Sequence, residues 1–436
     1  MPYNEPSPLE VKVLTRRFAL PNSASIATYL ATDGYTALRK ALEMTPERIL
    51  DELKVSSLRG RGGAGFPTGM KWSFVPRDSA KPKYIVVNAD ESEPGTCKDR
   101  LLIEYDPHQL IEGMLIAARV VGSARGYIYI RGEYRYLIDI MDRALAEAYA
   151  AGYLGANILG SGFAFDASTH TGAGAYECGE ESALLESLEG KRGIPRIRPP
   201  VPAVAGLYQS PTVLNNVESY CAVPAILRDG GAAFAALGTP KNGGTRLFCL
   251  SGHVNRPGVY ELPMGFNLLR MIEEVGGGIP GGKKLKAVIP GGSSCPVLKA
   301  DECDIPMDFD SLAKAKSMLG SGGVVVMDED TCMVKAALRI MRFYAHESCG
   351  WCIPCREGTL WLKKILTRVD DGAGVASDIG LIHDLAANML GRTFCPLGDA
   401  AAMPTLAFVE KFREEFEAHL DGRPCPFEHV NRMVTA

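Results

Sequence analysis

Four cysteines have the types and spacing of an iron–sulfur ligand set. Cys349, Cys352 and Cys355 follow one another at a three-residue step, and Cys395, which precedes a proline, lies further along the chain. Three thiolates so close in sequence must converge on one small object, and a remote Cys-Pro supplies the fourth ligand of a [4Fe–4S] cluster. Zinc is the main alternative, although structural zinc sites usually use two C-x2-C pairs, and unrelated thiols are the other. The spacing favours the cluster, with His346 beside it and not bound to it.

A glycine-rich loop is the second candidate for chemistry. Gly60, Gly62 and Gly65 form a G-x-G-x-x-G pattern. The dinucleotide fingerprint with this spacing follows a strand, whereas a helical pattern precedes the glycines here, so a plain turn remains an alternative. A loop with so many glycines suits a backbone that must approach a phosphate or a flat ring closely. Arg61 and Lys71 add positive charge nearby, with solvated surface charge as the alternative.

Polar residues gather where two expected strands end. Residues 83–87 and 163–168 have the apolar character of strands. The first strand leads into a polar stretch, 88–95, and the second into a glycine loop that opens a helix at 179–181. Open α/β sheets bind ligands beyond the carboxyl ends of their strands, so both stretches are candidate ligand contacts. The alternatives are a plain acidic loop for the first stretch and a favourable helix-dipole interaction for the acids of the second.

Length and composition limit the class of protein. At 436 residues the chain is too long for one compact core, and about two to four domains are expected. The net charge of −4 and the 22% of charged residues argue against nucleic-acid binding. No run is long and apolar enough to span a membrane, and residues 1–10 lack the features of a secretory signal. Twelve cysteines without export indicate a reducing compartment.

Alternating strand and helix patterns predict a multidomain α/β protein. Residues 1–34 are expected to form an N-terminal arm, and residues 35–241 a Rossmann-like domain with a mostly parallel sheet and flanking helices. The composition changes near Asn242, and residues 242–330 predict a small ubiquitin-like α+β module of the soluble-ligand-binding β-grasp type. Residues 331–436 predict a four-helix bundle with short connections.

The expected bundle explains how the cysteines meet. Its helices are predicted over 331–346, 354–369, 377–390 and 401–420. The three closely spaced cysteines lie at the first junction and the remote cysteine lies at the third. In an up-down bundle these two junctions fall at the same end, so the fold and the ligand set predict the same site.

With these motifs the chain resembles a known family, the flavin-binding, NADH-oxidising subunit of respiratory complex I (NADH–quinone oxidoreductase). The resemblance runs from about residue 35 to about residue 420. Its most specific stretches are GRGGAGFPTGMKW, NADESEPG, GAGAYECGEES, SGHVNRPGVYELPMG, ESCGWCIPCREG and FCPLGDA. The resemblance implies FMN and one [4Fe–4S] cluster as cofactors, and NAD(H) as the substrate, held in the Rossmann-like domain and the bundle.

The family's site residues can be carried over to the matching positions of this chain. For FMN they are Gly60, Arg61, Gly62, Gly63, Gly65, Lys71, Asn88, Asp90, Glu91, Gly179, Glu180, Asn215 and Asn216. For NADH they are Phe66, Phe74, Lys71, Glu93, Tyr176 and Glu181, with core packing as the alternative for the two phenylalanines. Glu93 and Glu181 are the expected catalytic residues, which disfavour negatively charged reduced flavin and ease product release.

The resemblance also implies a reaction and partners. NADH gives a hydride to the flavin, and single electrons then pass to the cluster, to other iron–sulfur subunits and to quinone. The implied partners are a thioredoxin-like [2Fe–2S] subunit and a large iron–sulfur subunit, at the cytoplasmic face of the membrane. Two positions depart from the family pattern: Glu177 replaces a branched apolar residue, and Val201 replaces an aromatic one. Neither departure removes an expected ligand.

Other functions fit the sequence less well. The diaphorase subunit of a soluble NAD-linked hydrogenase or formate dehydrogenase often carries extra cysteine motifs at one end, and none precedes Cys97 here. A zinc-stapled scaffold with a vestigial nucleotide fold would differ in its metal. A nicotinamide dehydrogenase without flavin is disfavoured because the glycine motif does not follow a strand.

Overall fold

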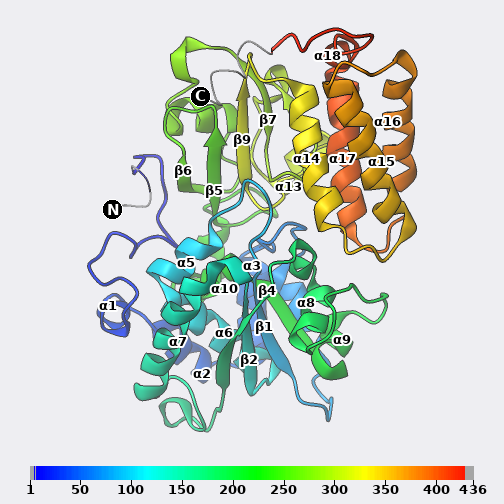
Figure 1. Cartoon of the computed structure of the whole chain (residues 1–436). Coiled ribbons are helices and arrows are strands. Elements are labelled where there is room, and N and C mark those ends of the chain that lie inside the picture. Colours follow the sequence, from blue (N-terminus) through cyan, green and yellow to red (C-terminus); the bar gives the residue numbers. More distant parts are fainter. Residues whose placement is uncertain (1–3, 5, 428–436) are drawn as a thin grey trace. The chain divides into compact units, whose positions relative to one another are not determined.

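The computed structural model describes residue 4 and residues 6–427. The chain divides into two compact units, each made of three segments (Figure 1). Unit 1 comprises Met1–Ser92, Thr96–Cys249 and Gly258–Phe266, and unit 2 comprises Glu93–Gly95, Leu250–Pro257 and Asn267–Ala436. Among the described residues, no helix combines the length and the apolar character that a bilayer span requires.

Unit 1 contains a parallel sheet of four strands in the order β3-β2-β1-β4. The strands are β1 (Tyr84–Ala89), β2 (Arg125–Ile130), β3 (Asp166–Thr171) and β4 (Thr212–Asn216). The expected parallel sheet is confirmed, but the strand predicted over 163–168 begins later, at Asp166. Phe165, with an apolar side chain typical of a strand, instead forms an isolated bridge with Gly155.

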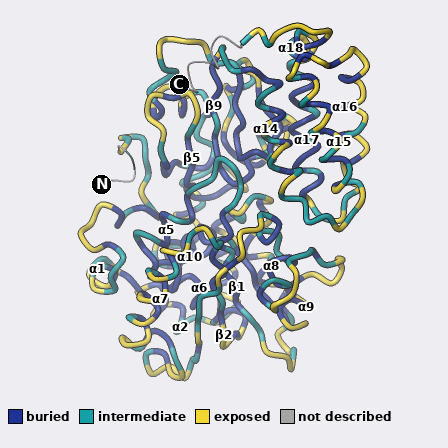
Figure 2. Tube along the Cα trace, in the orientation of Figure 1, coloured by how far each residue is buried: buried dark blue, intermediate teal, exposed yellow. Residues whose placement is uncertain are grey.

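Helices flank this sheet and supply many of the buried residues of unit 1. The longest are α6 (Pro107–Val121), α7 (Arg135–Ala150) and α10 (Val217–Asp229). Helix α6 is buried on nearly every face (Figure 2), and a Cβ added to Gly113 would lie 2.1 Å from the carbonyl oxygen of Tyr220. Helices α6 and α10 therefore pack at backbone distance. The others are α1 (Ile26–Ala31), α2 (Thr36–Glu43), α3 (Pro46–Val55), α4 (Thr68–Ser73), α5 (Asp99–Tyr105), α8 (Glu181–Leu188), α9 (Pro202–Ala205) and α11 (Gly231–Ala235).

A buried carboxylate ties the first and last segments of unit 1 together. Glu261, in strand β6 (Gly258–Pro263), accepts hydrogen bonds from the backbone N–H groups of Leu14 and Thr15, each at 2.9 Å. It also accepts one from the Thr245 hydroxyl at 2.5 Å. These donors satisfy a carboxylate that would otherwise be costly to bury. The irregular segment before α1 is thus fastened to the body of unit 1.

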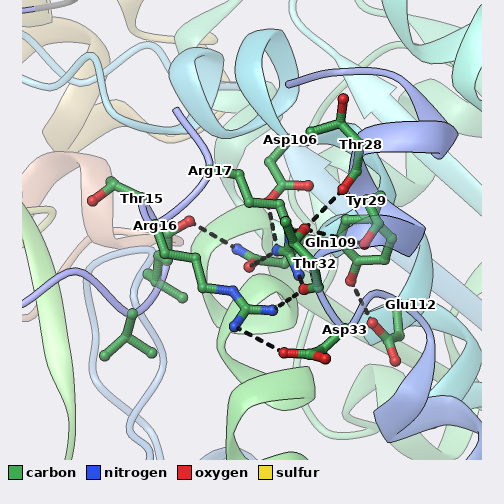
Figure 3. A network of polar contacts seen from close by, with 12 residues as sticks. Thr15, Arg16, Arg17, Thr28, Tyr29, Thr32, Asp33, Asp106, Gln109 and Glu112 are labelled. Atoms are coloured by element: carbon green, nitrogen blue, oxygen red, sulfur yellow. Dashed lines mark hydrogen bonds and ion pairs between the residues drawn. The ribbon is translucent and has the colours of Figure 1, made fainter. Parts of the chain in front are cut away.

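A second polar network joins the N-terminal segment to the start of α6 (Figure 3). The buried guanidinium of Arg17 donates to the Asp106 carboxylate at 2.9 Å and lies 4.2 Å from the ring centroid of Tyr29. The Tyr29 hydroxyl donates to Glu112, which also accepts from the backbone N–H of Leu38 at 2.8 Å. Burial raises the pKa of Asp106 to about 6, and Arg17 opposes that rise.

The stability of unit 1 is expected to depend on the protonation of Asp106. In an unfolded chain an aspartate titrates near pH 3.9, so between about pH 4 and 6 the native state binds more protons than the unfolded state. The Asp106 carboxyl therefore makes the free energy of unfolding fall as the pH rises from about 4 to about 6. An Asp106→Asn variant should lose this part of the slope in denaturant unfolding measured at several pH values.

Asp33→Asn is the matched control for that experiment. Asp33 pairs with Arg16 at 4.0 Å, but its side chain is 72% exposed, so its removal should leave the pH slope unchanged. An Asp106→Asn slope identical to that of the wild type would show that Asp106 does not titrate in this window.

Unit 2 begins with a small α+β region. Strand β7 (Leu285–Ile289) pairs antiparallel with β8 (Leu298–Lys299) and with β9 (Gly323–Asp328). Strand β5 (Thr245–Gly252) starts in unit 1, and the Ser251 hydroxyl near its end donates to the carbonyl of Val324. The expected helix over 267–275 is α12 (Leu268–Arg270) followed by a π-helical turn, Met271–Val275, and α13 (Phe309–Lys314) lies between β8 and β9.

The remainder of unit 2 is the predicted helical bundle. Helices α14 (Met333–Glu347), α15 (Ile353–Asp370), α16 (Ala376–Met389) and α17 (Pro396–Lys411) pack in sequence, and α14 also packs on α17 (Figure 1). The fourth helix starts earlier than predicted because Pro396 occupies its first turn, where proline is favoured. It also ends at Lys411, and a short fifth helix, α18 (Arg413–Glu417), follows. The predicted range 331–436 extends beyond the described residues.

Candidate functional site

The glycine loop lies against the end of β4. A Cβ added to Gly62 would lie 3.1 Å from the Cβ of Asn216, whereas one added to Gly63, whose φ is +146°, would meet nothing within 4 Å. The loop is closed by a 2.9 Å hydrogen bond from the Gly60 N–H to the Phe66 carbonyl. Its backbone therefore has one side packed on the sheet and open space at Gly63, which is the shape of a cradle for a flat or anionic group.

The side chain of Arg61 does not face that open space. Its buried guanidinium donates to the carbonyl oxygens of Gly243 and Thr245 at 2.8 and 3.0 Å. Burial lowers its pKa to about 9, and Glu218 acts in the opposite direction. In this conformation Arg61 fastens the loop to the start of β5, and its backbone N–H donates to the Ser219 hydroxyl at 2.9 Å. Its contact with FMN stays a prediction.

The end of β1 is joined to the turn before α8. The Asn88 amide donates to the Gly179 carbonyl at 2.8 Å, and its own oxygen accepts from the Asp90 N–H at 3.0 Å. A Cβ at Gly179 would come within 3.4 Å of the Asp90 carboxylate, so the turn passes directly over that side chain. The two polar stretches that the sequence places after different strands are thus neighbours.

Glu91 caps a helix. Its buried carboxylate accepts from the N–H groups of Asp99 and Arg100, at 2.7 and 3.2 Å, at the start of α5. Burial, together with the nearby Asp99 carboxylate, raises its pKa to about 8. Through these bonds Glu91 fastens the residues just after β1 to the start of α5. Its role in FMN binding stays a prediction.

The two asparagines at the end of β4 hold neighbouring elements. Asn215 accepts from the indole N–H of Trp72 at 2.9 Å, which fixes α4 against the sheet. Asn216 caps α10 through the Glu218 N–H at 3.0 Å and donates to Asp99 at 2.6 Å. Both predicted site residues therefore lie where β4 meets the glycine loop, and their side chains have structural partners.

The two phenylalanines expected to contact NADH flank helix α4. Phe66 precedes the helix and Phe74 follows it, and both are exposed, at 45% and 47%. Their ring centroids are 6.0 Å apart with an interplanar angle of 50°. Core packing, the alternative for these residues, is excluded by their exposure. Two adjacent exposed aromatic rings are suited to stacking on a planar ligand.

A charged group lies between α4 and α8. Lys71 pairs with Glu181 at 2.7 Å, and Arg198 pairs with Glu181 at 3.0 Å and also contacts Glu180. Although burial opposes it, the attraction of Lys71 and Arg198 lowers the pKa of Glu181. Glu181 is therefore ionised at neutral pH. Glu180 in turn caps α8 through the Ala183 N–H at 2.9 Å.

Arg198 is a site residue that the sequence reasoning missed. It comes from the stretch 192–202, which is rich in proline and arginine. Three arginines interleaved with prolines, close after a predicted acidic helix start, were the available signal. Val201, one of the two departures, is the exposed N-cap of α9, while Glu177, the other, is buried beside Cys178.

Glu93 belongs to unit 2. Its carboxylate accepts from the Ser294 N–H at 2.8 Å and from the Ser293 hydroxyl at 3.3 Å. The tight fit is visible at Gly292, where an added Cβ would lie 2.6 Å from the Glu93 side chain. Tyr176, in unit 1, is half-buried just before the Gly179 turn. The roles expected for both residues stay predictions.

The four predicted cluster ligands lie at one end of the bundle. Cys349 follows α14, Cys352 is the N-cap of α15, Cys355 lies in its first turn and Cys395 is the N-cap of α17. The two loops touch, because the rings of Trp351 and Phe394 meet edge to face with centroids 6.4 Å apart. Three of the thiols are thus at helix N-termini, where the dipole favours negative charge.

Known families cover most of the chain. Residues 53–225 match the Nuo51 FMN-binding domain, residues 246–326 an SLBB domain, and residues 335–419 the NADH-ubiquinone oxidoreductase-F iron–sulfur binding region. These matches define a flavin- and iron–sulfur-binding oxidoreductase subunit, in agreement with the sheet, the loop and the four cysteines.

Relatives define the family more closely. The F 2 subunit of NADH-quinone oxidoreductase from Rhizobium meliloti (strain 1021) is 56% identical, and the alignment covers 95% of this chain and 99% of the relative. The F subunit of the same enzyme from Streptomyces coelicolor is 51% identical over 99% of this chain and 96% of the relative. The chain therefore belongs to the family of NADH-quinone oxidoreductase F subunits.

A solved structure shares the fold. The NAD+-reducing [NiFe]-hydrogenase in its air-oxidised state has a chain that superposes with a TM-score of 0.81 at 37% identity. The match covers 91% of this chain and 67% of that one. The same hydrogenase in its H2-reduced state gives a TM-score of 0.82.

The residues present fit both cofactors. The open cradle at Gly63 and the adjacent cationic side chain of Lys71 suit a flavin phosphate and ring. The three-plus-one thiol set at converging loops suits a [4Fe–4S] cluster. The predicted cofactors, FMN and one [4Fe–4S] cluster, are confirmed by the domain matches.

Proposed function

We propose that this chain is the electron-input subunit of an NADH:quinone oxidoreductase and that the residues placed around the glycine loop form its flavin and NADH site. The observation that carries the proposal is the meeting of four segments, from Gly60, Asn88, Gly179 and Asn215, at the carboxyl edge of one parallel sheet. This edge is where open α/β sheets bind their ligands.

Each group in the site has a definite task. When bound, FMN takes two electrons from a nicotinamide and the cluster takes one at a time, so the flavin converts between them. The glycine backbone allows close approach and donates N–H groups, Lys71 supplies positive charge, and Phe66 and Phe74 offer faces for stacking. No side chain is required as a nucleophile.

The central test is the cofactor content of the full chain purified without oxygen. About one FMN and about four irons per chain are expected, with an EPR signal from the cluster after NADH is added, or after dithionite if the cluster potential is low. Zinc without iron or flavin would overturn the assignment and favour a structural scaffold.

Removal of the Glu181 charge is expected to raise the midpoint potential of the flavin. Glu181 is ionised beside Lys71 and Arg198, so a Glu181→Gln variant leaves two cations that stabilise reduced, anionic flavin. The expected rise is on the order of tens of millivolts, measured by anaerobic redox titration of the flavin absorption.

Asp229→Asn is the matched control for that titration. Asp229 ends α10 at the opposite end from Asn216 and is half exposed in a pair with Arg228. Its loss should leave the flavin potential unchanged. A Glu181→Gln potential equal to that of the wild type would show that Glu181 is not one of the groups that tune the flavin.

The proposed partners are a thioredoxin-like [2Fe–2S] subunit and a large iron–sulfur subunit, in an assembly attached to the cytoplasmic face of the membrane. Electrons that leave the cluster need a further centre nearby. Apolar side chains lie exposed around the cysteine loops, namely Trp351, Ile353 and Phe394, and such a surface suits a protein partner.

A hydrogenase diaphorase is the second candidate function. The observation in its favour is the fold similarity to the NAD+-reducing hydrogenase. That alignment leaves about a third of the hydrogenase chain uncovered, whereas the alignment with the Rhizobium relative covers 99% of that protein. Length and identity therefore favour the quinone-linked assembly, and co-purification with quinone-reducing or hydrogen-oxidising activity would decide between them.

A further inference from the structure

A second group of metal-ligating side chains lies in unit 2. The ligand atoms of Cys332, His419 and Cys425 all lie within 4.8 Å of one another. Cys332 and His419 are buried, and Cys425 is partly buried. Two thiols and one imidazole are the donors that structural zinc sites use most.

The imidazole of His419 is oriented as a ligand. Its Nδ1 lies 2.7 Å from the Glu415 carbonyl oxygen, which can only accept a hydrogen bond, so Nδ1 carries the proton. Nε2 therefore has a lone pair, and it faces the Cys332 sulfur at 3.4 Å. Metal-binding histidines almost always donate their other ring N–H to a carbonyl or carboxylate in this way.

The distance between the ligand atoms also fits a metal. Sulfur and nitrogen bound to one tetrahedral zinc, at about 2.3 and 2.0 Å, lie about 3.5 Å apart. The observed 3.4 Å between Cys332 and His419 agrees with that edge, although a thiol hydrogen bond would give a similar value. Cys332 also lies within hydrogen-bond reach of Cys425, so the three ligand atoms face one another as the ligands of one metal do.

This group is separate from the predicted cluster site. Cys332 is the N-cap of α14, and Cys349 follows the other end of that helix. A helix of 15 residues is about 22 Å long, so the two sets of cysteines cannot share one metal centre. The group instead joins the start of α14 to the residues that follow α18. Helix α18 itself packs on α14 (Figure 1).

We propose that Cys332, His419 and Cys425 bind a single zinc ion that staples the end of the chain to the start of the bundle. Binding converts two thiols to thiolates and releases two protons, with no change in oxidation state. The three side chains leave one tetrahedral position for another donor. The metal closes a loop between residues that are 87 positions apart in sequence, Cys332 and His419.

The test measures zinc in the cofactor-loaded full chain. After exposure to a chelator that spares iron, the wild type should rebind about one Zn²⁺ per chain, and Co²⁺ in its place should show thiolate charge-transfer absorption. Cys332→Ser and Cys425→Ser variants should each lower the Zn²⁺ affinity by about 100-fold or more while retaining FMN and iron. Retained cofactors show that these variants are folded.

Cys303→Ser is the matched control, since Cys303 is a buried thiol of the same unit that donates to the Lys299 carbonyl and lies outside the group. Its zinc affinity should equal that of the wild type. A wild-type chain that binds no Zn²⁺ or Co²⁺ at this level, or mass spectrometry that finds a Cys332–Cys425 disulfide in the anaerobic chain, would overturn the proposal.

Discussion

A Lys98→Met variant is expected to lower the free energy of unfolding of unit 1 by about 3–5 kcal/mol. Lys98 is 1% exposed and pairs with Asp99 at 2.7 Å and with Glu218 at 2.8 Å, which is fully buried. The attraction of these carboxylates outweighs the burial that would lower the lysine pKa and raises it instead. Without the ammonium group, both carboxylates stay buried with less compensation. The loss of stability is measured by denaturant unfolding, with the release of FMN as the signal that unit 1 has unfolded.

Arg125→Met is the comparison for this variant. Arg125 pairs with Asp166 at 3.9 Å, but both side chains are about half exposed. Such a surface pair contributes less than about 1 kcal/mol. If Lys98→Met lost no more stability than Arg125→Met, the buried carboxylates would have to be neutral or solvated in the native state.

The second large effect is expected from Cys355. Its thiol is buried in the first turn of α15, 3.2 Å from the Ser348 hydroxyl, so no solvent ligand can easily replace it. Cys355→Ser should reduce the iron content from about four to below about one per chain and abolish the cluster EPR signal. FMN content should not change, because the FMN-binding domain is residues 53–225.

Cys303→Ser again provides the control, because it removes a buried thiol of unit 2 that has no place in the ligand set. It should keep its iron. A Cys355→Ser chain that retained about four irons per chain would show that Cys355 is not a ligand of the cluster.

The sequence predicted the positions of the helices and strands well where a local pattern defines them. The apolar run before Asn88 became the inner strand β1, and the first three bundle helices begin and end close to the predicted residues, whereas the fourth begins and ends earlier than predicted. The third strand was misplaced because Phe163 and Phe165 look like strand residues, whereas Phe165 bridges to Gly155 outside the sheet. Such a bridge depends on a partner that local sequence does not reveal.

The site was predicted at the level of segments more than of side-chain atoms. The glycine loop and the ends of β1 and β4 meet as expected. Yet Glu91 caps α5 and Arg61 binds backbone carbonyls, roles that depend on where α5 and β5 are packed. Arg198 shows the converse, because its pairing with Glu181 arises only when the chain returns after α8.

The carboxylate of Glu261 has a consequence for how the protein is made. It binds the backbone of Leu14 and Thr15, so the first segment of unit 1 gains these partners only when residue 261 has been synthesised. Domains otherwise tend to fold as units while the N-terminal part emerges from the ribosome. Arg17 can pair with Asp106 as soon as α6 is made, but the backbone around Leu14 gains its partner only when strand β6 appears, so unit 1 completes its folding late in translation.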